Sequence, residues 1–103
     1  MDAEKKKRLE AKGWKFGDYA DLLGMSAEEK AVVEMRLAAK REIERLRAAS
    51  TLSQAELARR MGTKQPNVSR LFRDLGSASL DMLVRLLLAF GLDRKGVAAA
   101  LAL

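Results

Sequence analysis

Between positions 64 and 70 the chain concentrates side chains of the types that bind nucleic acid. They are Lys64, Gln65, Asn67, Ser69 and Arg70. In the major groove of DNA, Gln and Asn amides can pair with adenine, and an Arg guanidinium can form a forked pair with guanine. No carboxylate, which phosphate would repel, lies in this stretch. The pattern predicts a helix whose outer face enters a DNA groove.

The elements that must position this helix are marked by capping residues and a glycine. Ser53, with Glu56 three residues later, forms a capping box that begins a first helix. Gly62 permits the left-handed backbone of a turn, and Pro66 fits the first turn of the second helix, which runs to about residue 73. The residues expected to face the core are Leu57, Ala58, Met61, Val68 and Leu71. Two short helices joined in this way predict a helix-turn-helix over residues 53–72.

The remainder of the chain also predicts helices, so we expect an all-α fold. Good helix formers dominate the composition, and Pro66 is the sole proline. A second capping box, Ser26 to Glu29, begins a helix that should end near residue 49. Its predicted core stripe is Leu37, Ile43 and Leu46. Further helices are expected after the N-caps Ser79 and Asp93, with weak or short ones over residues 2–12 and 18–23. We expect an N-terminal extension over residues 1–25 and a DNA-binding domain over residues 26–103.

Composition narrows the classes of function. The 103 residues carry a net charge of +6, and residues 51–76 hold five cations against two anions. The sequence has no cysteine and no histidine, which removes the commonest metal ligands and the commonest general base. We therefore expect no enzyme activity, no cofactor and no metal site. With no signal peptide and no apolar run long enough to span a membrane, we expect a cytoplasmic protein.

The helix-turn-helix residues resemble the Cro/CI-like, XRE-type repressors of phages and bacteria. The residues at family spacing are Gln54, Leu57, Ala58, Gly62, Gln65, Val68, Ser69 and Leu71. Residues 79–91 resemble the fourth helix of that family, so the likeness covers about residues 37–92. It implies a lambda-repressor-like domain of about five helices. It also implies a transcriptional repressor that acts as a dimer on a two-fold symmetric operator in double-stranded DNA.

The resemblance implies a role for individual positions. Gln65 and Arg70 match base-reading positions, and Asn67 is a third candidate. Pro66 occupies another such position but has no side-chain group that can form a hydrogen bond there. The residues expected to contact phosphate are Gln54, Lys64, Ser69 and Arg73, although Ser69 could instead face water.

Three arginines outside the second helix are interpreted differently. Arg59 and Arg60 are expected to be solvent-exposed helix positions rather than DNA contacts. Arg47 matches a family arginine that often pairs with a glutamate. Here Phe72 stands at the partner position, so that pairing is not expected to form.

The N-terminal region leaves two interpretations open. Residues 14–26 are similar to a subgroup of short XRE regulators, many of which are HigA-like antitoxins. Such antitoxins pair with an RNA-cleaving toxin and repress their own operon. Trp14, Phe16 and Tyr19 would then be either a lid over the core or a surface that binds a small toxin protein. The cations at positions 5–8 are either a solvated tail or an electrostatic arm for DNA. An antitoxin is therefore the alternative function.

The helix expected after Ser79 is apolar nearly all round, because Arg85 alone interrupts residues 82–90. A helix that is apolar on every side must be covered on every side. One small domain covers one face, so the other face must contact the N-terminal segment, the last helix or a second subunit. We favour a second subunit that contacts Leu88, because operators read by such motifs are usually two-fold symmetric.

Overall fold

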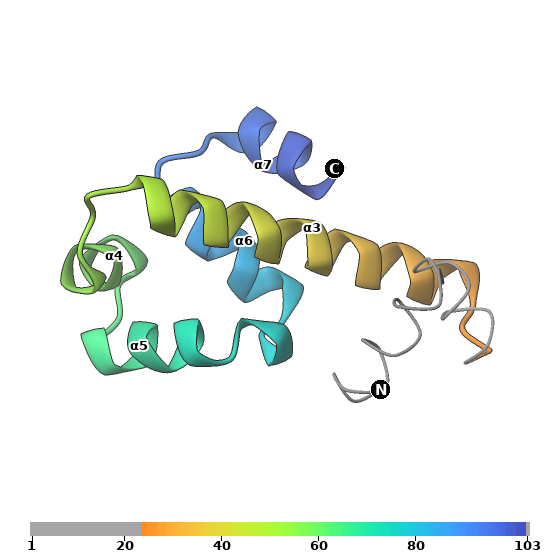
Figure 1. Cartoon of the computed structure of the whole chain (residues 1–103), viewed down its shortest axis with the longest axis horizontal. Helices are drawn as coiled ribbons and strands as arrows, with labels where there is room; N and C mark the ends of the chain where they lie inside the picture. Colours follow the sequence, from red (N-terminus) through yellow and green to blue (C-terminus); the bar gives the residue numbers. More distant parts are fainter. Residues whose placement is uncertain (1–23, 103) are drawn as a thin grey trace. The chain divides into compact units, whose positions relative to one another are not determined.

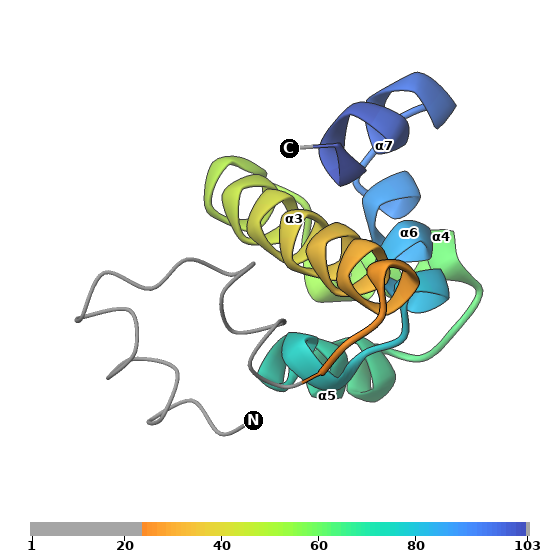
Figure 2. The same cartoon turned by 90° about the vertical axis from the view of Figure 1, so that its right-hand side faces the viewer.

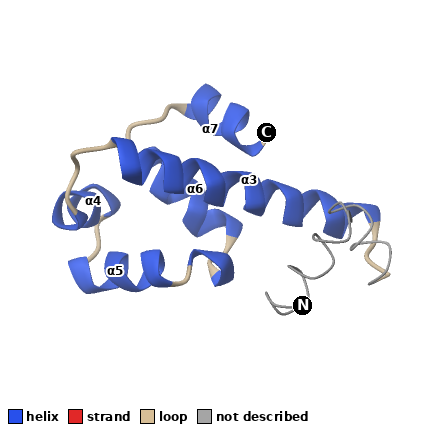
Figure 3. Cartoon of the chain, in the orientation of Figure 1, coloured by secondary structure: helices blue, strands red, loops and turns tan. Residues whose placement is uncertain are grey.

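The computed structural model describes residues 24–102, and every regular element among them is helical (Figure 3). The predicted all-α class is therefore confirmed. None of the helices described is long and apolar enough to cross a bilayer. The expected helices at 2–12 and 18–23 lie outside the described residues. The elements are α3 (Ala27–Ala49), α4 (Gln54–Met61), α5 (Gln65–Arg73), the 3-10 turn η1 (Leu75–Ser77), α6 (Leu80–Ala89) and α7 (Arg94–Leu101).

Four of these helices begin at the N-caps that the sequence predicted. In each case a side-chain oxygen accepts a hydrogen bond, 2.8 to 3.1 Å long, from the backbone amide three residues later. These bonds satisfy amides that have no partner inside the helix. The capping residues of α3, α4, α6 and α7 are Ser26, Ser53, Ser79 and Asp93.

The chain divides into two compact units, residues 1–31 and residues 32–103. The described part of the first unit is residues 24–31, which include the start of α3. The second unit contains the rest of α3 and all later helices. The domain boundary between residues 25 and 26 stays a prediction.

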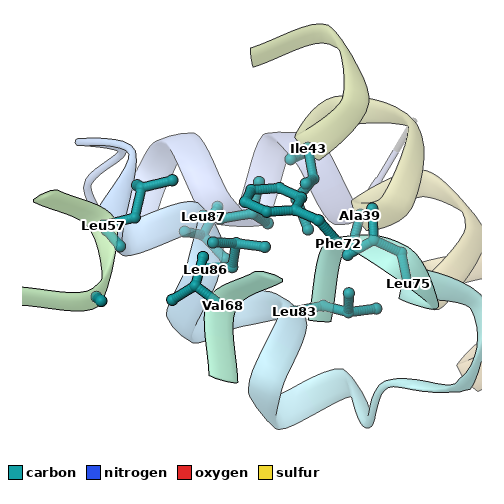
Figure 4. Packing of buried hydrophobic residues seen from close by; sticks show 13 residues of the cluster. Ala39, Ile43, Leu57, Val68, Phe72, Leu75, Leu83, Leu86 and Leu87 are labelled. Carbon is teal, nitrogen blue, oxygen red and sulfur yellow. The ribbon is translucent and has the colours of Figure 1, made fainter. Parts of the chain in front are cut away.

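Within the second unit, one hydrophobic core holds the helices together. α4 packs against α5 and α6, and α6 packs against α7. Figures 1 and 2 show α5 and α7 on opposite sides of α6. Side chains from all five helices meet in the core, much of which is shown in Figure 4. The largest fully buried side chains are Ile43, Leu57, Val68, Leu83, Leu86 and Leu87.

The connection that follows α5 is fastened to α3 by Arg36. Its Nη2 donates hydrogen bonds to the carbonyl oxygens of Gly76, at 2.9 Å, and Ala78, at 3.0 Å. Because the donor is charged, each bond is stronger than one between neutral groups. These bonds hold η1 and the approach to α6, and they thereby fix the path of the chain that leaves α5.

Candidate nucleic-acid interface

The turn between α4 and α5 sets the direction of the second helix. Gly62 has φ +69°, the left-handed conformation that a side chain would strain. Its N–H donates to the Arg59 carbonyl at 3.2 Å, and the Thr63 N–H donates to the Ala58 carbonyl at 2.9 Å. This pair of bonds is the Schellman arrangement that ends a helix. The predicted turn is thus confirmed, and it starts α5 three residues after the left-handed glycine.

The helix α5 has one buried face and one exposed face. Val68 and Phe72, four residues apart, are buried, and Leu71 is half-buried against the same core. The side chains left exposed on this helix include all three predicted base-reading residues, which are Gln65, Asn67 and Arg70. α5 contains no Asp or Glu. The helix therefore presents amides and a cation to solvent, with no carboxylate to repel phosphate.

The N-terminus of α5 differs from the starts of the neighbouring helices. Its N-cap is Lys64, whose side chain makes no capping hydrogen bond, and Pro66 lies in the first turn. No acidic residue lies in that turn. The positive end of the helix dipole therefore coincides with an exposed lysine. Both favour an anion such as phosphate.

The other predicted phosphate contacts differ in accessibility. Arg73, in the last turn of α5, is exposed, and like Lys64 it forms no ion pair with another described residue. Gln54, the first residue of α4, and Ser69 are half-buried. Within residues 24–102, two cations without an ion-pair partner thus lie at the two ends of α5.

The arginines of α4 are exposed, as predicted, and both are paired within the protein, while their lack of contact with DNA stays a prediction. Arg59 and Arg60 both donate hydrogen bonds to the carboxylate of Glu56. The hydrogen bond from Arg59 is the main cause that lowers the pKa of Glu56 to about 2. Arg60 also donates to the Ala89 carbonyl at 3.0 Å, which ties α4 to the end of α6. Glu56 therefore offsets one of the two positive charges of α4, whereas the two arginines of α5 have no acidic residue on their own helix.

The outer face of α5 also contains a hydrogen-bonded row that the sequence did not predict. Asn67 Nδ2 donates to Thr63 Oγ1 at 2.8 Å. Arg70 Nη2 donates to Asn67 Oδ1. The spacings of four and three residues place these side chains over one another on one face. Such spacing is the signal from which the contacts could have been predicted.

Phe72 replaces the acidic partner that the resemblance assigns to Arg47. The Arg47 guanidinium carbon lies 4.5 Å from the centre of the Phe72 ring. Phe72 also meets Phe90 edge to face, with ring centres 6.4 Å apart. Figure 4 shows the Phe72 ring in the core beside Ile43 of α3. A cation–π contact between Arg47 of α3 and Phe72 of α5 thus takes the place of the ion pair that the family likeness assigns to this arginine.

Comparison with known families agrees with this geometry. A family model described as helix-turn-helix matches residues 43–96, which is more than half of the chain. The chain belongs to the XRE-type helix-turn-helix family. Comparisons with curated proteins and with solved structures gave no match.

Membership in this family supports the lambda-repressor-like fold and makes the chain a DNA-binding transcription regulator. In this family the second helix of the motif, here α5, is the recognition helix. Residues 24–102 contain no cluster of acidic side chains that could hold a metal ion. The antitoxin hypothesis rests mainly on residues 14–23, which lie outside the described residues, so it stays a prediction.

Proposed function

We propose that this XRE-type regulator is a repressor that binds a two-fold symmetric operator as a dimer. Gln65 and Arg70 would read base edges from α5 in the major groove, with Asn67 as a third candidate. Lys64 and Arg73 would hold phosphates at the two ends of α5. Gln54 and Ser69, which are half-buried, would make further contacts to phosphates.

The observation that carries this proposal is the composition of the exposed face of α5. A helix-turn-helix needs a recognition helix that is anchored by apolar side chains and presents on its outer face side chains that can reach base edges. α5 meets both conditions, because Val68 and Phe72 anchor it while Gln65 and Arg70 stand in solvent. Gln and Arg differ in the bases they prefer, so the face can discriminate sequences.

Selection from a library of random duplex DNA tests the proposal directly. The full chain should enrich an inverted repeat, with half-sites separated by about one helical turn, roughly 34–36 Å from centre to centre. Placed across a promoter, the enriched duplex should lower expression of a reporter gene when the protein is present. Enrichment of no sequence would contradict sequence-specific binding, and enrichment of a single unrepeated half-site would contradict the dimer.

The surface of α6 supports a second copy of the chain as the partner. The domain covers Leu83, Leu86 and Leu87, but Met82 and Leu88 remain 37% and 45% exposed. Leu88 lies between two hollows, one of about 260 Å³ bordered by α7 and one of about 370 Å³ bordered by α4. A protruding leucine beside open hollows suits a self-complementary contact in which each copy supplies both features.

The variant Leu88→Glu tests this surface. Because Leu88 is about half exposed, the subunit should still fold, whereas a dimer would have to bury an unpaired charge at a cost of several kcal/mol. Sedimentation velocity should therefore report a monomer. Val32→Glu is a matched control, because Val32 is similarly exposed, at 43%, but lies on α3. A Leu88→Glu variant that stays dimeric would place the interface elsewhere.

A further inference from the structure

We propose that Asn67 and Thr63 are positioning residues, which hold the Arg70 guanidinium ready to read a base. Asn67 would then act through Arg70 rather than read a base of its own. This inference rests on the proposed function, because it concerns how the base-reading side chain is oriented. It assigns a role to Thr63, a residue of the turn that the family likeness does not include among the DNA contacts.

The geometry of the row carries the inference. Thr63 lies in the turn before α5, Asn67 in its first turn and Arg70 in the next. Asn67 Nδ2 donates to Thr63 Oγ1 at 2.8 Å, and Asn67 Oδ1 accepts from Arg70 Nη2. The chain of bonds therefore runs from the backbone turn, through the asparagine amide, to the guanidinium.

Each end of the Asn67 amide makes one of these two bonds, which together fix the orientation of the amide. An asparagine reads adenine by using its oxygen and its nitrogen together on one base. Asn67 keeps one N–H and one oxygen lone pair, so to read adenine while bonded to Thr63 and Arg70 it would have to present both of these to the base in the one orientation that the row allows. An Arg guanidinium, in contrast, has five N–H donors in a fixed fork, so Arg70 can keep one bond to Asn67 while its remaining donors face guanine.

The expected benefit is preorganisation. An arginine side chain has many rotamers in solution, and ordering it at an interface reduces affinity. Holding one rotamer before DNA arrives should improve recognition of a single base pair by about 2- to 10-fold. Gln65 provides the comparison, because it lies on the same exposed face but has no bond to this row in the described structure.

The test measures base preference at each position of the half-site. The DNA is the duplex that the parent protein enriches from a random library, with every single base-pair change made in turn. Arg70→Ala should relax preference at one base pair by about 5- to 150-fold. Asn67→Ala and Thr63→Val should relax the same base pair by about 2- to 10-fold. The double variant Asn67→Ala/Arg70→Ala should match Arg70→Ala alone.

Conservative and control variants separate positioning from loss of structure. Thr63→Ser keeps the hydroxyl and should behave as the parent. Gln65→Ala should relax a different base pair, and its effect should add to that of Arg70→Ala. Far-ultraviolet circular dichroism should be the same for all variants, because these side chains contribute little to the core.

The outcomes are distinguishable. If the parent enriches no sequence, the proposed function fails and this inference fails with it. If a sequence is enriched but Asn67→Ala relaxes a base pair of its own, additively with Arg70→Ala, then Asn67 reads a base and this inference alone is overturned. A Thr63→Val variant with the parent's full preference would also overturn it.

Discussion

The contact between Arg47 and Phe72 predicts a measurable coupling between α3 and the recognition helix. Phe72 is 9% exposed, meets Phe90 edge to face and lies under the Arg47 guanidinium. Phe72→Leu keeps most of the buried apolar volume but removes both ring contacts. An edge-to-face pair contributes about 0.5–1.5 kcal/mol beyond burial. A cation–π contact of an exposed arginine adds about 0.5–1 kcal/mol.

Phe72→Leu should therefore lower the free energy of unfolding by about 1–2.5 kcal/mol. The melting temperature of a domain of this size should fall by about 4–8 °C for each kcal/mol. Arg47→Met keeps the aliphatic stem and removes the charge, so it should cost about 0.5–1 kcal/mol. Urea unfolding followed by circular dichroism gives both values.

A double-mutant cycle decides whether the two side chains interact. If the cation–π contact is real, adding Arg47→Met to Phe72→Leu should cost almost nothing further, which leaves a coupling free energy of about 0.5–1 kcal/mol. Purely additive effects of the two substitutions would refute the contact. Loss of stability in Arg47→Met that is equally large with and without Phe72 would assign Arg47 to another partner.

Two further predictions concern charge. Lys64→Ala and Arg73→Ala should each weaken binding to all DNA sequences equally and reduce the slope of log affinity against log salt by about one per subunit. The control is Arg94→Ala on α7, which lies across α6 from α5 (Figure 1) and should leave the slope unchanged. If the slope is also unchanged in Lys64→Ala and Arg73→Ala, these two residues do not contact phosphate. Hydrogen bonds from Arg59 and Arg60 to the ionised carboxylate lower the pKa of Glu56 from 4.5 to about 2. The contribution of Glu56 to stability is therefore complete above about pH 4.5 and is lost as the pH falls towards 2. Glu56→Gln should flatten this part of the curve of unfolding free energy against pH. If parent and variant lose the same unfolding free energy at acid pH, the ion pairs of Glu56 contribute nothing to stability.

The framework of the fold was predictable from local signals. Ser53, Ser79 and Asp93 cap helices, and Gly62 takes the left-handed conformation, because each of these roles depends on one residue and its neighbours. The exposure of Gln65 and Arg70 also followed from the sequence, since the opposite side of α5 is apolar.

Contacts that depend on packing were harder to predict. Spacing of three residues selected Leu71 as the partner of Val68 in the core, but Phe72, four residues on, is the more deeply buried. A short helix with 3.6 residues per turn is compatible with either spacing, and tertiary packing decides between them. On α3, Ala38, Ala39 and Ile43 are buried, while Leu37 and Leu46 are half-buried, so the predicted stripe contained only one of the three buried residues.

The pairing of side chains on the surface was also not predicted from the sequence. The capping box predicted that the Glu56 side chain could accept a hydrogen bond from the backbone N–H of the N-cap, Ser53. The carboxylate instead accepts hydrogen bonds from Arg59 and Arg60, which follow it by three and four residues. Their positive charge strengthens these bonds. The Asn67 row has the same origin, since Thr63 and Arg70 lie at those spacings on either side. The residue types of the recognition face were therefore evident, but their mutual arrangement needed the structure.

The most direct test of base reading by α5 compares Arg70→Ala and Arg70→Lys on two DNAs at one salt concentration. One DNA is the duplex that the parent selects, and the other is a random duplex of the same length. If Arg70 forms a forked pair with guanine, Arg70→Ala should cost about 1–3 kcal/mol on the selected duplex and much less on the random one. Arg70→Lys should lose specificity as well, because an ammonium cannot reproduce the fork. Parallel losses on both duplexes, with Arg70→Lys equal to the parent, would contradict base reading by this residue.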